Sequence, residues 1–178
     1  MRLLLATTIL VCVVSGVVSG QQAPAKPKPR TFSVEVFQVV GLPLNVQDAV
    51  VVEKGGGYLL QCRLANESAS EIVGFRYSLT ILDPVLGARL LANRTEGFGI
   101  DAYGSKKLTF VNPIKFKHKD GDRLILMLEQ VLSPESIWEV VKAKDALDSY
   151  VKGDYSVQPT VMRVPNQVDV PPQIRVIN

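Results

Sequence analysis

Apolar residues recur at every second position in several segments of this chain, which is the spacing of β-strands. In the clearest run, residues 73–81, they are Val73, Phe75, Tyr77, Leu79 and Ile81. Shorter runs with the same spacing occur at 32–36, 58–64 and 107–111, and Gly, Pro, Asn and Asp residues separate them. The sequence therefore predicts short strands joined by turns.

This pattern, with only one segment of helical period, predicts an all-β fold: an immunoglobulin-like antiparallel β-sandwich with one short C-terminal helix. A small barrel is the alternative architecture. The composition agrees with a folded domain, because 47% of the 178 residues are hydrophobic and 21% are charged. Such a chain is long and apolar enough to bury one core.

Residues 123–132 are apolar on both faces, which is typical of a strand that is covered on both sides. The next segment allows two structures. Ser133 and Pro134 either form a turn into a strand at 137–140, which contains Trp138, or begin one long helix. We favour the hairpin, followed by a helix at 142–152 whose apolar stripe could cover the second face of strand 123–132.

Two polar stretches are expected to lie outside strands. One is the turn-rich segment 41–48, and the other is residues 93–99, expected as an exposed loop after a short strand at 89–92. Asn66 and Asn93 begin sequences that fit the glycosylation sequon, which in a bacterial protein are simply turns.

The two ends of the chain differ in composition from the predicted β domain. Residues 1–20 are expected to form a signal peptide, because a positive start precedes an apolar run and small residues follow it, with an uncleaved anchor as the alternative. Residues 21–30 form a Pro/Lys-rich linker, and residues 31–152 hold the sandwich and helix. The expected location is periplasmic or extracellular, with no membrane span after signal cleavage.

Residues 153–178 are expected to form an extended arm, because prolines interrupt the segment and its many apolar residues need a surface to dock on. Docking on the chain's own domain is the first expectation. The alternative is addition to a partner's sheet, for which Val170, Ile174 and Val176 are the candidate partner-binding residues.

The residue inventory argues against an enzyme. A net charge of +3 is too low for nucleic acid to be an expected partner. His118 is the only histidine, and loss of the leader removes Cys12 and leaves Cys62 alone, so copper and zinc sites and a disulfide are not expected. No serine-hydrolase motif is present. We therefore predict no catalytic, cofactor-binding or metal-binding residues and no cofactor.

Three segments carry a family resemblance. They are 62–68, which ends in Asn66-Glu-Ser68, then 79–83, which ends in Asp83, and Gly104-Ser105 before the strand at 108–110. These segments resemble the FxLYD-type immunoglobulin-like domains of exported bacterial proteins over residues 31–140, although residues 80–83 are Thr-Ile-Leu-Asp where the family has Phe-x-Leu-Tyr-Asp. The resemblance implies a binding or assembly module without catalytic residues.

Together these observations predict an exported non-catalytic β-sandwich module that mediates protein–protein interaction or assembly in the cell envelope, through a sheet edge or the C-terminal arm. The alternative is a periplasmic small-ligand carrier or hydrolase with a pocket between the sheet and helix 142–152, lined by Trp138 and Tyr150.

Overall fold

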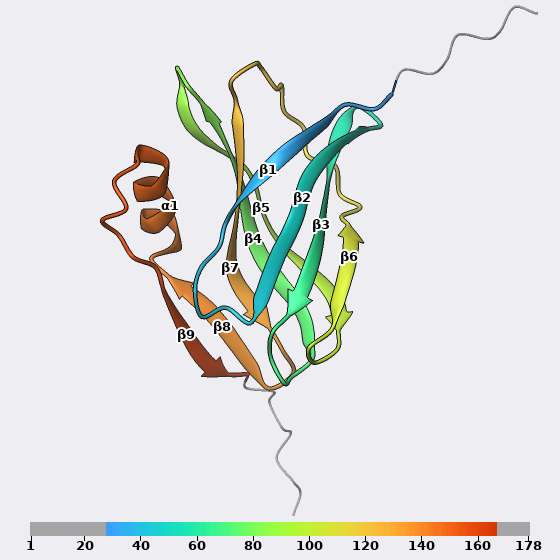
Figure 1. Ribbon diagram of the computed structural model, residues 1–178, viewed down its shortest axis with the longest axis vertical. Coiled ribbons are helices and arrows are strands. Elements are labelled where there is room, and N and C mark those ends of the chain that lie inside the picture. The colour runs from blue at the N-terminus through green and yellow to red at the C-terminus, as the bar shows by residue number, and fades with distance from the viewer. Residues whose placement is uncertain (1–27, 167–178) are drawn as a thin grey trace, which may run out of the picture.

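The fold is mostly β, with one short helix beside a curled mixed sheet (Figure 1). The computed structural model describes residues 28–166, so the predicted signal peptide lies outside the described residues. The elements, in chain order, are β1 (Thr31–Phe37), β2 (Leu44–Lys54), β3 (Gly57–Asn66), β4 (Ile72–Asp83), β5 (Gly87–Ile100), β6 (Ser105–Thr109), β7 (Arg123–Leu132), β8 (Ser136–Val141), α1 (Ala143–Lys152) and β9 (Thr160–Pro165).

Strand β1 connects the two halves of the sheet. Its first residues pair antiparallel with β2, whereas residues 34–37 pair parallel with β7. The strand order is β5-β4-β7-β1-β2-β3-β6, and β8 and β9 continue from the end of β7. The parallel pair corrects the expectation of a purely antiparallel sheet. Alternation in a sequence shows which face of a strand is buried, but not the direction of its neighbours.

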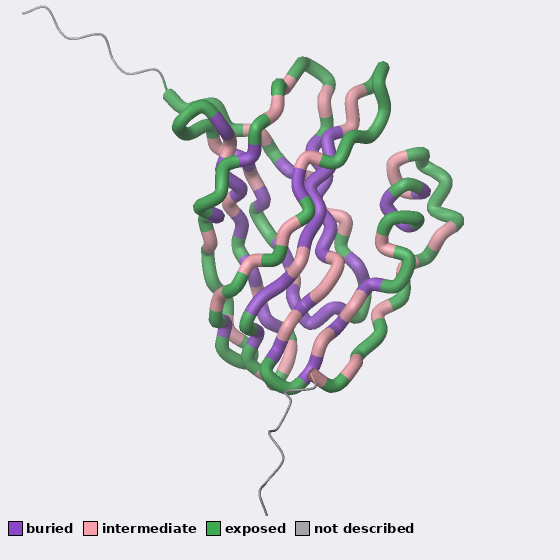
Figure 2. Tube along the Cα trace, turned by 180° about the vertical axis from the view of Figure 1, so that it is seen from behind, coloured by how far each residue is buried: buried purple, intermediate pink, exposed green. Residues whose placement is uncertain are grey.

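The concave side of the sheet holds the main core, which Figure 2 shows as purple segments along the strands. Leu60, Cys62 and Leu64 of β3 are buried on one face as predicted. In β4 the predicted residues from Phe75 onward are buried too. Val73 is an exception at 37% exposure, because a β-bulge shifts the register between Ile72 and Gly74.

The predicted hairpin and helix are confirmed at the C-terminal side. Ser133 and Ser136 close the turn between β7 and β8, with the Ser136 amide donating to the Ser133 hydroxyl oxygen at 2.9 Å. Helix α1 ends at Gly153, whose positive φ of 72° allows the amides of residues 153 and 154 to cap the last turn. A single helix from residue 133 is therefore excluded.

Two predictions about polar segments were wrong. Residues 44–54 form β2, and residues 87–100 form the continuous strand β5 instead of a short strand and a loop. In β2, Asp48 has a φ of 52° beside a register shift, which breaks the apolar alternation. β5 is an end strand that pairs only with β4 in the described sheet, so much of it faces solvent and needs no apolar pattern.

Asn66 fastens the end of β3 to the chain after β5. Its side chain is buried, and its Nδ2 donates to the carbonyl oxygens of Ser70 at 2.8 Å and Asp101 at 2.9 Å. The Ser68 amide donates to Asn66 Oδ1 at 2.9 Å. This sequon asparagine therefore has a structural role at a turn, whereas Asn93 lies within β5.

A close approach of two strands predicts the effect of adding one methyl group. A Cβ at Gly74 would lie 2.7 Å from the backbone oxygen of Glu96, whereas a Cβ at the paired Gly97 has its nearest contact at 3.9 Å. We expect Gly74→Ala to lower the free energy of unfolding by about 1–3 kcal/mol and Gly97→Ala to change it by less than about 0.5 kcal/mol, measured by urea unfolding. Equal effects of the two substitutions would contradict this packing.

Candidate binding site

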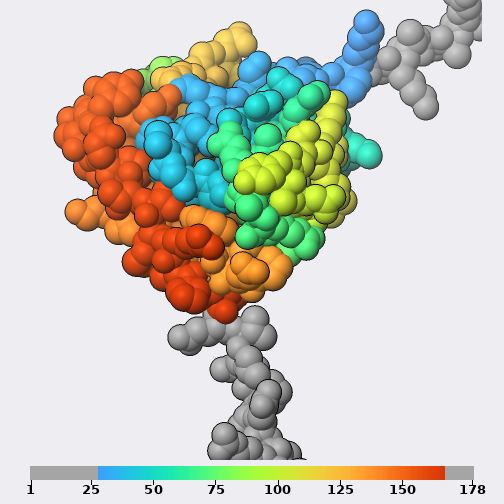
Figure 3. All heavy atoms as spheres, turned by 60° about the horizontal axis from the view of Figure 1, so that its bottom comes forward, coloured from blue at the N-terminus to red at the C-terminus, as the bar shows by residue number. Residues whose placement is uncertain are grey.

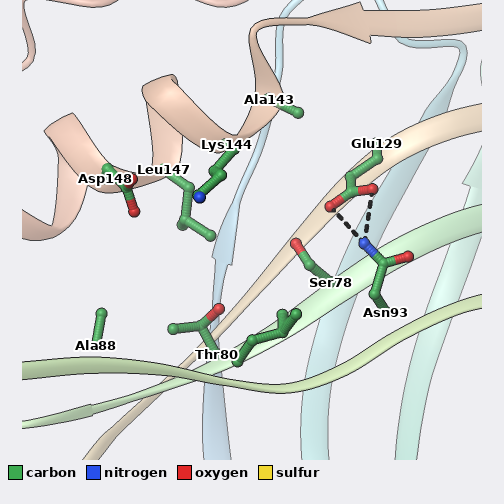
Figure 4. Close-up of a pocket in the computed structure, with 10 residues that line it drawn as sticks. Ser78, Thr80, Ala88, Asn93, Glu129, Ala143, Lys144, Leu147 and Asp148 are labelled. Carbon is green, nitrogen blue, oxygen red and sulfur yellow. Dashed lines mark hydrogen bonds between the residues drawn. The ribbon is translucent and has the colours of Figure 1, made fainter.

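A cavity of about 260 Å³ lies between α1 and the convex face of strands β4, β5 and β7 (Figure 4). It is lined by Ser78, Thr80, Ala88, Leu90, Asn93, Glu129, Ala143, Lys144, Leu147 and Asp148. The lining combines apolar walls with a few polar groups, which is the usual composition of a binding pocket.

The register of the sheet explains why space is left here. Ser78 and Thr80 occupy alternate positions of β4 on the face opposite the core aromatics, and they pair with Met127 and Ile125 of β7. Their short side chains do not reach the helix. Leu147 closes the helix side of the cavity, because it lies on the buried stripe of α1.

Glu129 supplies the main charge on the sheet side of the cavity. It is the extra residue at a register shift between β4 and β7, and its side chain is only 14% exposed. Asn93 Nδ2 donates to both carboxylate oxygens at 3.0 and 3.1 Å, as Figure 4 shows. The Arg76 guanidinium forms an ion pair with Glu129 at 3.2 Å and reaches Glu139 at 3.7 Å. The carboxylate is therefore held in a fixed position.

The hydroxyl group of Ser78 also borders the cavity. The residue is 3% exposed, and its hydroxyl has no hydrogen-bond partner in the described part of the chain. A buried polar group without a partner costs about 1–3 kcal/mol, so a ligand atom that bonded to this hydroxyl would recover part of that cost. Among the described residues that line the cavity, Ser78 is the one with a buried polar atom that lacks a partner.

A second hollow, of about 370 Å³, lies on the other face of β5 near the β4–β5 turn. Its lining includes Ile81, Leu86, Arg89, Lys117 and Lys119. Val85, Leu86 and Leu90 are 88%, 79% and 57% exposed, so the hairpin end presents apolar surface to solvent. The outer edge of β5 is thus flanked by a hollow on each face.

The pocket predicted beside the helix is present, but Trp138 and Tyr150 do not line this cavity. Tyr150 instead lines a smaller hollow of about 130 Å³ between α1 and residues 37–40. Trp138 is 8% exposed and packs under the Arg163 guanidinium, which lies 5.0 Å from the ring centroid. Tyr150 points toward β1 and stacks on Phe37 with 4.5 Å between ring centroids. Ser78 and Glu129 were missed, although a carboxylate within the apolar strand 123–132 was a visible signal.

Tyr150 and Arg123 also fix the charge of Glu35 on β1. Both side chains donate to the Glu35 carboxylate, and the Arg123 Nη2 to Glu35 Oε2 distance is 2.6 Å. Partial burial raises the pKa of Glu35, but these hydrogen bonds and the Arg123 charge outweigh it and hold the pKa below the ordinary 4.5. The bond to Glu35, with partial burial, raises the pKa of Tyr150 to about 12. This cluster fastens α1 to the sheet and so keeps the cavity in shape.

Three other reactive or potentially metal-binding side chains, those of Cys62, His118 and Asp122, have structural roles. Cys62 is buried, and the His118 ring stacks on Phe32 at 3.9 Å between centroids. Asp122 caps its turn by accepting a hydrogen bond from the Lys119 amide at 2.8 Å. Among residues 28–166, no group of three or more His, Cys, Asp or Glu side chains could hold a metal ion.

The C-terminal arm docks on its own domain as far as it is described. Residues 160–165 form β9, which pairs antiparallel with β8. Figure 3 shows the orange and red atoms of α1 and β9 against the blue atoms of β1 and the following loop, where a Cβ on Gly41 would lie 3.6 Å from Val161. Val170, Ile174 and Val176, the candidate partner-binding residues, lie outside the described residues.

Comparison with known proteins gives no relative: no protein-family model matches the chain, and a search of curated proteins finds no match. In the described part of the chain, no helix has the length and apolar character needed to cross a bilayer.

From the Glu35 cluster we predict how the free energy of unfolding depends on pH. Because the folded-state pKa is lowered, this stabilisation is complete above about pH 4.5 and is lost as the pH falls through the folded-state value. We expect the unfolding free energy of the wild type to fall more between about pH 6 and about pH 3 than that of Glu35→Gln. Glu53→Gln, at an exposed carboxylate, is the control and should keep the wild-type slope. Parallel curves for wild type and Glu35→Gln would contradict the role of this cluster.

Cys62 is expected to be unreactive in the folded protein, because burial raises the pKa of its thiol to about 12. In a Cys12→Ser chain, a thiol-specific disulfide reagent at about pH 8 should label Cys62 only after unfolding in urea. Ser105→Cys in the same background places a thiol at an exposed position and should be labelled in the native state. Rapid labelling of native Cys62 would show that this part of the core opens.

Proposed function

We propose that this chain is an exported, non-catalytic immunoglobulin-like module that binds an extended segment of a partner protein along the outer edge of β5. The observation that carries the proposal is the position of this edge. The strand has no hydrogen-bonded neighbour on that side in the described sheet, and hollows of about 260 and 370 Å³ flank its two faces. Strand addition uses backbone bonds for affinity and pockets for alternate side chains for specificity.

Two successive side chains of β5 face different hollows, and Ala88 borders both. Leu90 pairs with Thr80 and faces the cavity under α1, whereas Arg89 pairs with Ile81 and faces the second hollow. An added strand follows the same alternation, so its successive side chains would be directed to one hollow and then the other.

The other two outer strands are less suited to a partner. β6 has five residues and carries Lys106 and Lys107, and lysines at an edge disfavour pairing with another strand. β9 has six residues and ends at Pro165, which cannot donate a backbone hydrogen bond. β5 carries an apolar stretch at Leu90-Leu91, and its N-terminal part, residues 87–93, offers an unpaired edge.

The sequence of residues 1–20 supports export of the protein, and the path of strand β1 supports an immunoglobulin-like fold. The leader-like composition of residues 1–20 supports export to the periplasm or beyond. The passage of β1 from β2 to β7 supports two packed layers, because strands that switch between sheets form the corners of sandwiches. A small-ligand carrier is the second candidate, supported by the cavity under α1, but this cavity is smaller than the typical 300–1,000 Å³ of ligand pockets.

The test begins with peptides selected from a displayed random library on the immobilised chain. We expect a selected peptide to slow hydrogen exchange of amides 87–92 and to leave the β6 amides unchanged. Backbone N-methylation of the peptide should weaken binding at every second residue, because only alternate amides face β5. Failure to select any peptide, or protection confined to another region, would overturn the proposal.

A pair of proline variants supplies the matched control in the protein. Amides alternate in direction along a strand, so one of Arg89→Pro and Leu90→Pro removes an amide that faces away from β4. That variant should keep wild-type urea stability and bind the selected peptide about tenfold more weakly. The other variant should lose stability instead. Unchanged peptide binding by the stable variant would contradict strand addition.

A further inference from the structure

We infer that the cavity under α1 recognises an alkylammonium group, presented as a lysine side chain by the partner segment on β5. This inference rests on the proposed partner site and names the residue type that the site selects. The evidence is the shape of the cavity, the acceptors on its sheet side and the charges along its lining.

The shape suits one long side chain. The cavity holds about 260 Å³, and its walls at Ala88, Leu90 and Leu147 are apolar. The four-carbon stem of lysine can pack along such walls while its ammonium reaches a polar end. Leu90 and Ala88 both belong to β5, so the cavity opens next to the strand edge from which the side chain would come.

The sheet side of the cavity accepts hydrogen bonds. The Glu129 carboxylate is held by Asn93 and Arg76, and the Ser78 hydroxyl oxygen lies nearby without a partner in the described residues. An ammonium carries three donors and no acceptor, which matches a carboxylate and a hydroxyl oxygen. Ser78 is 3% exposed, so its unmade bond is a feature of the interior and not of the solvated surface.

The cavity already accommodates an ammonium group, that of Lys144, while the Glu129 charge is shared with Arg76 outside the lining. Glu129 and Asp148 are negative and Lys144 is the one positive residue among those that line the cavity. Figure 4 shows the Lys144 ammonium directed from α1 toward the strands, where this side chain of the protein occupies part of the space. Lys144 can move away to Asp148, four residues further along the helix, where opposite charges attract. An incoming ammonium would replace that of Lys144.

The experiment uses the full chain and a small probe, Nα-acetyl-lysine N-methylamide, with the norleucine and glutamate analogues as controls. We expect the lysine probe to give saturable NMR shifts at the amides of Ser78, Thr80 and Glu129, and the two analogues to bind at least about tenfold more weakly, since a charge-assisted hydrogen bond is lost. Equal shifts with norleucine, or preference for glutamate, would overturn the inference.

Three variants test separately the contributions of Glu129, Ser78 and Lys144 to binding of the lysine probe. Glu129→Gln and Ser78→Ala should each weaken binding of the lysine probe at least about fivefold. If loss of the Glu129 charge unfolds the chain, because Arg76 then keeps only Glu139 as a partner, Ser78→Ala alone carries the test. Lys144→Ala should keep or strengthen binding, because it removes the competing ammonium. Unchanged affinity in Ser78→Ala and in a folded Glu129→Gln variant, or loss of binding in Lys144→Ala, would contradict the proposed site.

The outcomes separate this inference from the proposed function. Selected peptides that protect β5 but tolerate replacement of every lysine by norleucine would overturn the lysine site alone. Binding of the lysine probe without any peptide on the β5 edge would overturn strand addition and leave an ammonium-binding cavity.

Discussion

The structure depends on the need to cover both faces of β7. Residues 124–128 of this strand are all at most 2% exposed, and a sheet with one solvated face could not bury them. The concave core covers one face. The other face lies beside Glu35 and Phe37 of β1, which hold Tyr150 of α1 through a hydrogen bond and a ring stack. The helix is therefore part of the core, and its placement creates the cavity.

The cavity exists because this cover is incomplete. Helix α1 packs closely where β1 offers Phe37, but across β4 it faces the short side chains of Ser78 and Thr80. Filling the gap with larger apolar residues would increase the buried area and the stability. The chain instead places there the buried Ser78 hydroxyl, which has no partner in the described residues and so opposes stability. Such a local conflict is what a binding site is expected to show.

Much of the fold followed from the sequence where burial decides the pattern. The alternation in β3 and β4, the apolar run of β7 and the helix ending at Gly153 were predicted because each buries a defined face. β2 and β5 were not fully predicted, because a bulge at Asp48 and an exposed edge remove the alternation. The parallel pairing of β1 with β7 joins residues far apart in sequence, so no local pattern reports it. A pocket beside the helix was expected, but its polar residues were missed, since Ser78, Asn93 and Glu129 meet only through the register of three strands.

The arrangement of edges links this fold to its proposed role. In the curled sheet, the C-terminal half of β5 comes close to β6, where the Lys106 ammonium donates to the Gly99 backbone oxygen at 3.2 Å and residues of both strands line one hollow. That half is therefore protected by the chain itself. The N-terminal half, near Leu90, projects past this closure with its apolar hairpin end exposed. An exposed edge strand is an aggregation hazard that natural proteins usually block with charges or prolines, and Arg89 is the charge in this part of β5. The proposed partner strand depends on this exposed segment and on the hollow at each of its faces.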